Sequence, residues 1–355
     1  MIPANVPAQR PRDAKLLVID ARGRIVHAPR ARFVAYLRLG DLAIANDAAT
    51  LPASLHGVHA GSGAAIELRL AGRSSLSAQD VHRFTGVVFG AGDFRVRTED
   101  RPPPPRLASG DRLTLGPLEA TVERVVRHPR LVALRFHGPH DAVWAGFARH
   151  GRPIQYAHMQ TPLELWDVWT RIAAVPAAFE PPSASFLLDW ESIRAMHHRG
   201  IAFATVTVAT GISSTGDADL DRCLPFDEPY RISEATASSI LTAQERGGRI
   251  VAIGTSVVRA LEHAASRDGV VRPGEGVADQ RLGPASCLRV VDTILSGTHE
   301  PGTSHYEMLR AFVNDDTLAD ADGQLDTFGY RTHEFGDSVL IERAERPIID
   351  TGAAA

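Results

Sequence analysis

The segment 296–305 brings together the side chains of this sequence that are best suited to acid–base chemistry. It reads Ser-Gly-Thr-His-Glu-Pro-Gly-Thr-Ser-His, so two imidazoles, a carboxylate and four hydroxyls share one irregular stretch. A histidine near its ordinary pKa exchanges a proton at neutral pH, which makes His299 a candidate general base. Pro301 and Gly302 interrupt any helix that would present both imidazoles to zinc, so we expect no metal site. The alternative, a capping loop for a helix beginning near Ser304, explains the hydroxyls but not His299.

A second group of candidate residues follows the β-branched run Arg249–Ile253. We expect Gly254 to form a turn between this strand and a helix over about 255–267, which begins with Thr255 and Ser256. The free backbone N–H groups and partial positive charge of a helix N-terminus attract carboxylates and phosphates. The sequence therefore indicates an anion-binding corner here, with a plain helix start as the alternative.

Other patterns carry less weight. Arg259 and Glu262 lie three residues apart on the same expected helix, where they could act on a substrate or form only a surface ion pair. The Gly61–Gly63 turn is not a dinucleotide fingerprint, because Ile66 stands where the third glycine belongs. No GxSxG motif is present, which disfavours acyl hydrolysis.

Composition limits the remaining function classes. The chain has 355 residues, and 38 basic against 42 acidic side chains give a formal charge of −4, so any nucleic acid must bind a local patch. Cys223 and Cys287 have no disulfide or zinc spacing around them. Neither a signal peptide nor a membrane span is apparent in the sequence, and we expect a soluble, cytoplasmic protein without membrane partners.

The elements that must position these residues divide into two classes. We expect a discontinuous, doubly wound, three-layer α/β domain from residues 1–57 and 150–355, with a small antiparallel β-barrel domain (58–149) inserted into it. In the α/β part the pattern predicts a helix over 186–199, a helix capped by Ser233, and strands at 201–208, 249–253, 288–291 and 338–342. The predicted barrel strands are 64–70, 84–88, 94–98, 112–115, 118–126 and 131–136.

Read in order, short motifs along the chain resemble the S-adenosylmethionine:tRNA ribosyltransferase-isomerase family of queuosine biosynthesis. They span nearly the whole sequence. They are Lys15–Asp20, Leu37–Leu42, Asn46-Asp47, Leu51–Gly57, Gly247–Ser256 with Arg259 and Leu261-Glu262, Val290–Asp292, Thr298–Pro301, Tyr330-Arg331, Gly336-Asp337 and Leu340-Ile341.

This resemblance implies a reaction, a co-substrate and a set of site residues. The family moves and rearranges the ribosyl part of S-adenosylmethionine onto a 7-aminomethyl-7-deazaguanine base in tRNA, which gives epoxyqueuosine and releases adenine and methionine. The co-substrate is S-adenosylmethionine, the partner is tRNA, no metal is needed, and we expect a monomer or weak homodimer. By resemblance, the catalytic residues are His299, Glu228 and Arg259, and the substrate-binding residues are Gly254, Thr255, Ser256, Glu262, Asp292, Thr298, Asp337 and Asn46.

The sequence departs from the family pattern at several polar positions. Ser185 stands where the family has a histidine, Val208–Gly211 replaces Leu-His-Val-Gly, and Cys223–Glu228 keeps only the glutamate of a histidine-containing run. Two alternatives therefore stay open: a paralogue that uses S-adenosylmethionine on a small amine, and a non-catalytic relative that binds cofactor or RNA.

Overall fold

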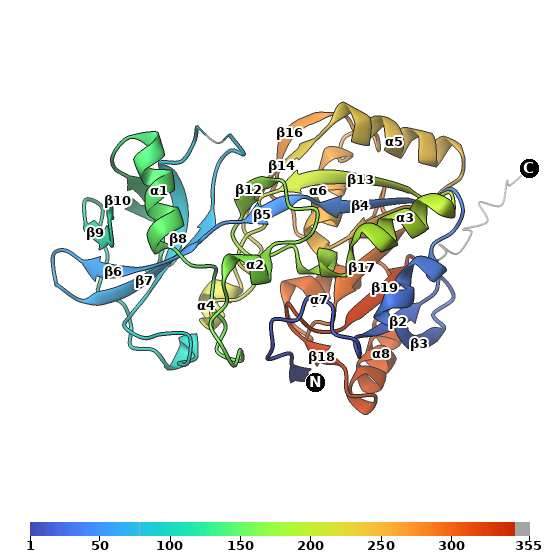
Figure 1. The fold of residues 1–355 in the computed structure, drawn as a ribbon, viewed down its shortest axis with the longest axis horizontal. Coiled ribbons are helices and arrows are strands. Elements are labelled where there is room, and N and C mark those ends of the chain that lie inside the picture. Colours follow the sequence, from blue (N-terminus) through green and yellow to red (C-terminus); the bar gives the residue numbers. More distant parts are fainter. Residues whose placement is uncertain (78, 345–355) are drawn as a thin grey trace, which may run out of the picture.

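The computed structural model describes residues 1–77 and 79–344, which form a large sheet covered by helices and a separate closed barrel. Figure 1 shows the barrel on one side of the molecule and the sheet with its helices on the other. In the described part of the chain, no helix combines the length and apolar character needed to cross a membrane. The predicted class, a three-layer α/β domain with an inserted antiparallel barrel, is confirmed.

The large sheet is mixed rather than purely parallel. The pairs β13–β4, β4–β15, β15–β17 and β19–β2 are parallel, and the other neighbours are antiparallel. In spatial order its strands are β16 (Gly274–Ala278), β14 (Glu228–Ile232), β13 (Ala202–Val208), β4 (Leu42–Asn46), β15 (Ile250–Ile253), β17 (Thr293–Gly297), β19 (Ser338–Glu342), β2 (Lys15–Ile19) and β3 (Ile25–Pro29).

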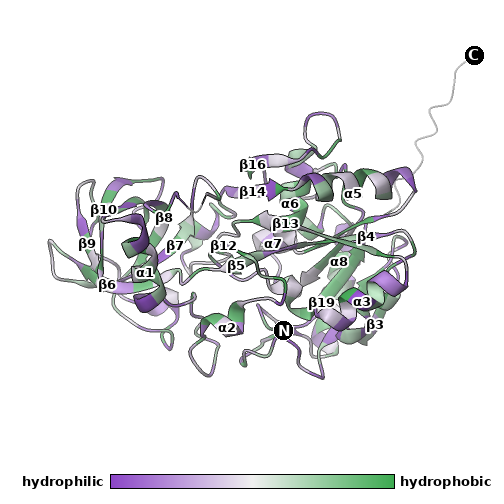
Figure 2. Ribbon diagram, turned by 45° about the horizontal axis from the view of Figure 1, so that its top comes forward, coloured by the Kyte–Doolittle hydropathy of each residue, from purple (hydrophilic) through white to green (hydrophobic). Residues whose placement is uncertain are grey.

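Helices cover both faces of this sheet because its strands are apolar on both sides. Leu17 and Ile19 pack with one face, and Leu16 and Val18 with the other, as the two-residue period of a strand requires. Figure 2 shows hydrophobic residues concentrated in the central strands. The first face carries α5 (Glu234–Glu245), α6 (Thr255–Ala264), α7 (Ser304–Leu309) and α8 (Asp315–Thr327), and the second carries η1 (Arg30–Tyr36), η3 (Ser183–Leu187) and α3 (Trp190–His198).

The barrel is closed by six antiparallel strands, one of which differs from the prediction. Segment 94–98 is a loop, because the Asp93 carboxylate accepts the Arg95 backbone N–H at 2.9 Å and so forms a local turn. The sixth strand is instead 54–59. In spatial order the strands are β10 (Leu118–Val125), β11 (Leu131–Phe136), β8 (Arg83–Phe89), β7 (Ala65–Gly72), β6 (Ser54–His59) and β9 (Arg112–Leu115).

The chain enters and leaves the barrel at adjacent points. Ser54 and Arg152 pair through two backbone hydrogen bonds, and α1 (His140–His150) packs on the barrel core just before this return. The division at residues 58 and 149 stays a proposal, with the first barrel strand starting at Ser54. Shorter elements are β1 (Ile2–Pro3) on β18 (Arg331–Thr332), β5 (Ala48–Thr50) on β12 (Val175–Ala178), η2 (Thr98–Asp100), α2 (Leu165–Val168) and α4 (Ala218–Asp221).

Two predicted elements of the α/β domain differ from the structure. The helix expected over 186–199 is broken, because Asp189 adopts an extended conformation and caps α3 by accepting the Ser192 N–H at 2.8 Å. The strand expected at 288–291 is not a strand, because the Glu262 carboxylate takes the N–H groups of Val290 and Val291. The strand of this region, β17, lies further along the chain.

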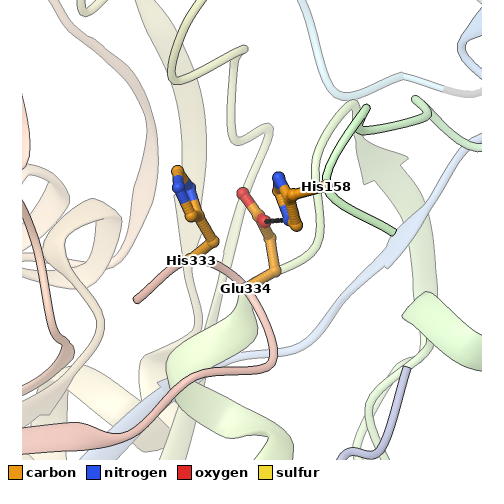
Figure 3. Close-up of side chains that lie close together, drawn as sticks. All are labelled: His158, His333 and Glu334. Carbon is orange, nitrogen blue, oxygen red and sulfur yellow. Dashed lines mark ion pairs between the residues drawn. The ribbon is translucent and has the colours of Figure 1, made fainter. Parts of the chain in front are cut away.

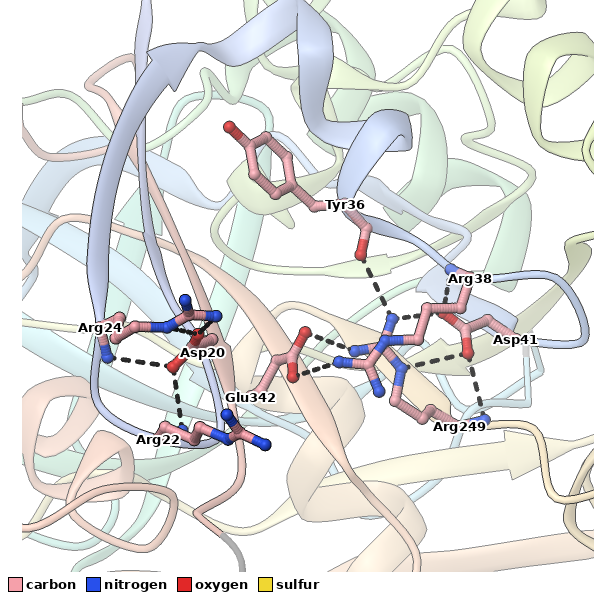
Figure 4. Close-up of polar contacts among 8 residues, drawn as sticks. All are labelled: Asp20, Arg22, Arg24, Tyr36, Arg38, Asp41, Arg249 and Glu342. Carbon is pink, nitrogen blue, oxygen red and sulfur yellow. Dashed lines mark hydrogen bonds and ion pairs between the residues drawn. The ribbon is translucent and has the colours of Figure 1, made fainter.

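A buried ionic network fixes the end of the sheet opposite to the carboxyl ends of β4 and β15. Figure 4 shows Arg249 between two carboxylates. Its guanidinium donates to Asp41 and to Glu342, each at 2.6 Å, and Glu342 also pairs with Arg38. Asp41 is only 1% exposed, so its charge depends on Arg249 for compensation. Two of the motif segments quoted above, around Asp41 and Arg249, are therefore structural.

We expect Arg249→Leu to lower the free energy of unfolding by about 2 kcal/mol, because it leaves two carboxylates without their shared donor. Urea denaturation followed by circular dichroism measures the change. Arg246→Ala, an exposed neighbour at the end of α5, is the matched control and should shift the midpoint little. Equal stability of both variants would contradict the structural role of the network.

Candidate active site

A polar cavity lies where β13, β15 and β17 end, the edge of an α/β sheet at which ligands bind. Six separate segments of the sequence form its wall, at 180–184, 210–214, 225–228, 254–256, 296–305 and 332–334. Of the residues predicted from the sequence, it contains Glu228, Gly254, Thr255, Ser256, Thr298 and His299.

Gly254 forms the sharp turn between β15 and α6. Its φ of +105° lies in a region that residues with a Cβ rarely adopt, which explains a glycine here. No side chain caps the following helix, and its first two residues line the cavity. The N-terminus of α6 therefore offers backbone N–H groups and a partial positive charge to an anion in the cavity.

His299 extends from the loop after β17 beside two further polar groups. Its Nε2 lies 2.9 Å from the Ser296 hydroxyl, and its ring centroid lies 4.6 Å from that of His305. Burial, and then the charges of His305 and His333, lower the pKa of His299 well below its usual range. The imidazole is therefore neutral at physiological pH and keeps a lone pair, as a proton acceptor needs.

Glu228 and Arg259 form a buried ion pair at the wall of the cavity. Arg259 Nη1 lies 2.6 Å from Glu228 Oε2, and Glu228 Oε1 accepts the Gly211 N–H at 3.1 Å. The guanidinium also donates to the carbonyls of Phe226, Ala278 and Gln280, and Arg259 is only 2% exposed. Its donors are thus used inside the protein, so Arg259 positions Glu228 rather than lining the cavity.

Four predicted binding residues lie outside the cavity lining because the backbone uses their side chains. Glu262 accepts the N–H groups that follow Leu288, and Asp337 accepts those of Lys15 and Arg331. Asp292 precedes β17 instead of following a strand, so it lies at the opposite end of the sheet and pairs with Arg343.

Asn46, the fourth of these residues, ties the end of β4 to the loop after β13. Its amide donates to the Val208 carbonyl and to the Thr210 hydroxyl, and its oxygen accepts the N–H groups of Val208 and Ala48. Thr210 and Gly211 line the cavity. Asn46 thus shapes the wall from behind.

The structure adds a cluster of titratable side chains that sequence reasoning missed. It consists of Glu180, Tyr156, His158, His333 and Glu334, and Figure 3 shows the last three together. His158 Nε2 lies 3.9 Å from Glu334 Oε2, and its ring stacks 4.5 Å from that of His333. Burial raises the pKa of Glu334 to about 7, while burial and the charge of Glu334 raise that of Glu180 to about 8.

These groups come from three loops that are far apart in the sequence, so no local spacing marks them. One signal was visible: His333 and Glu334 adjoin the Gly336-Asp337 motif. His333 also has φ +68°, the only positive φ of a residue other than glycine in the part of the chain that the structure describes. Such strain is frequent at functional sites.

Comparison with known proteins decides the family. The model of the family described as "Queuosine biosynthesis protein" matches residues 2–341. The chain belongs to this family. It is 30% identical to the S-adenosylmethionine:tRNA ribosyltransferase-isomerase of Pelobacter propionicus, with 96% of each protein covered. The protein of the same name from Sorangium cellulosum is also 30% identical, over 97% of this chain and 96% of the relative.

The fold has a solved counterpart. The crystal structure of S-adenosylmethionine tRNA ribosyltransferase from Thermotoga maritima matches with a TM-score of 0.50 and 23% identity, over 96% of both chains. The family model and the 30% identical relatives confirm the family predicted from the motifs.

Proposed function

We propose that this chain transfers and isomerises the ribosyl moiety of S-adenosylmethionine onto a 7-aminomethyl-7-deazaguanine base in tRNA, forming epoxyqueuosine and releasing adenine and methionine. The observation that carries the proposal is a neutral imidazole, His299, in the same cavity as the uncapped N-terminus of α6. S-adenosylmethionine needs both kinds of partner, because it carries a carboxylate and acidic hydrogens beside its sulfonium. The names of the relatives support this assignment.

The methionine carboxylate binds at Gly254, Thr255 and Ser256 in this proposal. The backbone N–H groups at the start of α6 donate to it, and the helix dipole adds about 0.3–1 kcal/mol. The helix α6 is ten residues long, and the backbone N–H groups of its first turn have no acceptor within the helix, so they are free to bind the carboxylate. Arg259, whose donors are taken by Glu228 and backbone carbonyls, contributes by holding the wall in place.

His299 removes the proton next to the sulfonium. The Ser296 hydroxyl fixes the orientation of the ring, and burial keeps the ring uncharged so that it can accept a proton. Thr298 donates its hydroxyl to the Arg331 carbonyl at 2.6 Å and so holds the loop that carries His299. Glu228 presents a carboxylate at the cavity wall that can accept hydrogen bonds from ribose hydroxyls.

Incubation of the protein with radiolabelled S-adenosylmethionine tests the proposal. Adenine and methionine should appear only together with tRNA that contains the aminomethyl-deazaguanine base, and the label should enter that tRNA. Turnover with small primary amines and not with the tRNA would identify a paralogue with another acceptor. Binding of S-adenosylmethionine without turnover on any acceptor would identify a non-catalytic relative.

We expect Gly254→Ala to weaken S-adenosylmethionine binding by about tenfold, because the strained backbone must move and carries the N–H groups with it. A residue with a Cβ in this conformation costs about 1–3 kcal/mol. Isothermal titration calorimetry measures the dissociation constant. Gly247→Ala is the matched control. Gly247 also has a positive φ, +71°, but it follows the C-terminus of α5, and an added Cβ would meet no atom within 4 Å. It should lose stability but keep its affinity, and equal weakening in both variants would argue against the binding role.

A further inference from the structure

A second cavity opens beside the one described above, and the two share a wall. Tyr156 and His158 line the second cavity together with barrel residues, whereas Glu180 lines the first. The residues common to both cavities are Ser213, Ser214, Glu300, His333 and Glu334. A group that reaches Glu334 from the second cavity therefore meets whatever is bound in the first.

Two carboxyl groups at this wall, those of the buried Glu180 and the partly buried Glu334, have no arginine or lysine paired with them among the described residues. Glu180 is 4% exposed; its carboxylate accepts the Ser213 N–H at 2.8 Å and lies beside the Tyr156 hydroxyl. The charge of Arg69 reaches Glu180, but its guanidinium is bound to Glu67 at 2.7 Å. Burial lowers the pKa of His158 to about 4, so the imidazole nearest to Glu334 is neutral. A buried carboxylate without a cation is costly to keep charged, so a cationic ligand beside these two groups would be stabilised.

Several polar atoms around the pair lack a hydrogen-bond partner. They are the Thr332 hydroxyl, Glu334 Oε2 and His158 Nε2, and Thr332 is 1% exposed and lines the first cavity. Buried polar atoms in native proteins are normally satisfied, so unpaired ones beside a cavity indicate a ligand with donors and acceptors of its own. The stacked rings of Tyr156, His158 and His333, 5.5 and 4.5 Å apart, provide a flat surface for a planar ligand.

We propose that Glu180 and Glu334 receive the protonated primary amine of the acceptor base and that Glu180 takes its proton. This rests on the proposed function and adds the catalytic groups on the acceptor side. An ammonium has no lone pair, so it must lose a proton before it can attack carbon. One N–H bond of the ammonium breaks, the proton bonds to a Glu180 oxygen, and the electron pair stays on nitrogen. The carboxylate becomes a neutral acid and the total charge is unchanged.

The titration of the pair gives the proposal a pH signature. Tyr156 and Glu334 face Glu180, as do the Ser213 N–H and the more distant Arg69, while Tyr156, His158 and His333 face Glu334. Because the pKa of Glu180 is raised to about 8, its carboxylate fraction and the transfer rate fall as the pH drops below that value. Burial is the larger cause of this raised pKa and the charge of Glu334 the smaller one, so Glu334→Gln should move the acid side of the profile part of the way to lower pH.

The experiment compares an RNA hairpin that carries the aminomethyl-deazaguanine base with the same hairpin that carries guanine. The wild-type protein should bind the first about 10-fold to 100-fold more tightly, as one charge-assisted hydrogen bond allows. Glu180→Gln and Glu334→Gln should abolish this preference and keep the dissociation constant of S-adenosylmethionine within about twofold. Glu180→Gln should also lower kcat by about 100-fold or more. Glu245→Gln, an exposed carboxylate at the end of α5 that lines neither cavity, is the control and should behave as wild type.

The other outcomes overturn either the inference or the proposed function. A wild-type protein that binds both hairpins equally, or Gln variants that keep the preference, would show that the pair does not receive the amine. His158, His333 and Glu334 could also hold a divalent cation, because their ligand atoms lie within 4.8 Å of one another. A preference that disappears on chelation and returns with zinc would replace the amine site by a metal site. If the preference depends on the pair but no ribosyl transfer occurs, the amine site stands and the proposed function fails.

Discussion

The His299→Ala variant is expected to release adenine from S-adenosylmethionine about 10²-fold to 10⁴-fold more slowly than the wild type, the range that one general base contributes. No other imidazole takes the same place: the Ser296 hydroxyl orients His299, and the ring centroid of His305 lies 4.6 Å from that of His299. Water that fills the space left by the ring lacks its basicity and its fixed orientation. Single-turnover release of labelled adenine, with saturating acceptor RNA, measures the effect.

The pH dependence separates this role from a structural one. The pKa of His299 lies well below its usual value, so its neutral fraction stays high as the pH falls through 6.5, and protonation of this ring should not limit the rate there. His197→Ala, an exposed histidine at the end of α3, is the control. Full activity of His299→Ala with unchanged co-substrate affinity would remove the base assignment and move attention to His305.

Local rules sufficed for the elements that hold one side of the cavity. The β-branched run before Gly254 and the amphipathic pattern after it predict β15, the turn and α6, because each step depends only on neighbouring residues. The Ser233 cap and the strand β19 were found in the same way. Segment 94–98 was misread because strand propensity says nothing of the Asp93 turn that competes with pairing.

The other side of the cavity could not be predicted, because distant contacts decide it. Glu262 was a good binding candidate by its position on α6, yet its carboxylate holds the backbone of 290–291 and so prevents a strand there. That one contact also explains the misplacement of Asp292, which was expected after a strand and in fact precedes one. Glu180 and Glu334 are far apart in the sequence and come together only in the folded chain, where both line the cavity.

Arg259→Leu is expected to lower the free energy of unfolding by about 3–5 kcal/mol, because it leaves the Glu228 carboxylate buried without its cation. Both side chains are nearly inaccessible, at 3% and 6% exposed, so water cannot replace the lost partner. Three backbone carbonyls, including those of Phe226 and Ala278, lose their donor at the same time. Urea denaturation measures the loss, and a stability within about 1 kcal/mol of wild type would contradict the assignment of a buried, fully compensated pair.

Two further variants of the Arg259–Glu228 pair separate its stability from its function. Arg259→Lys should not restore wild-type stability, because a lysine has three donors on one nitrogen and cannot reach Glu228 and the three carbonyls together. Arg259→Leu combined with Glu228→Leu removes the unpaired charge and should recover much of the lost stability. The double variant still lacks the carboxylate at the cavity wall, so its affinity for S-adenosylmethionine should stay low. Recovery of both stability and affinity would show that Glu228 serves the fold alone, which would leave the N-terminus of α6 and His299 as the groups that bind and activate the co-substrate.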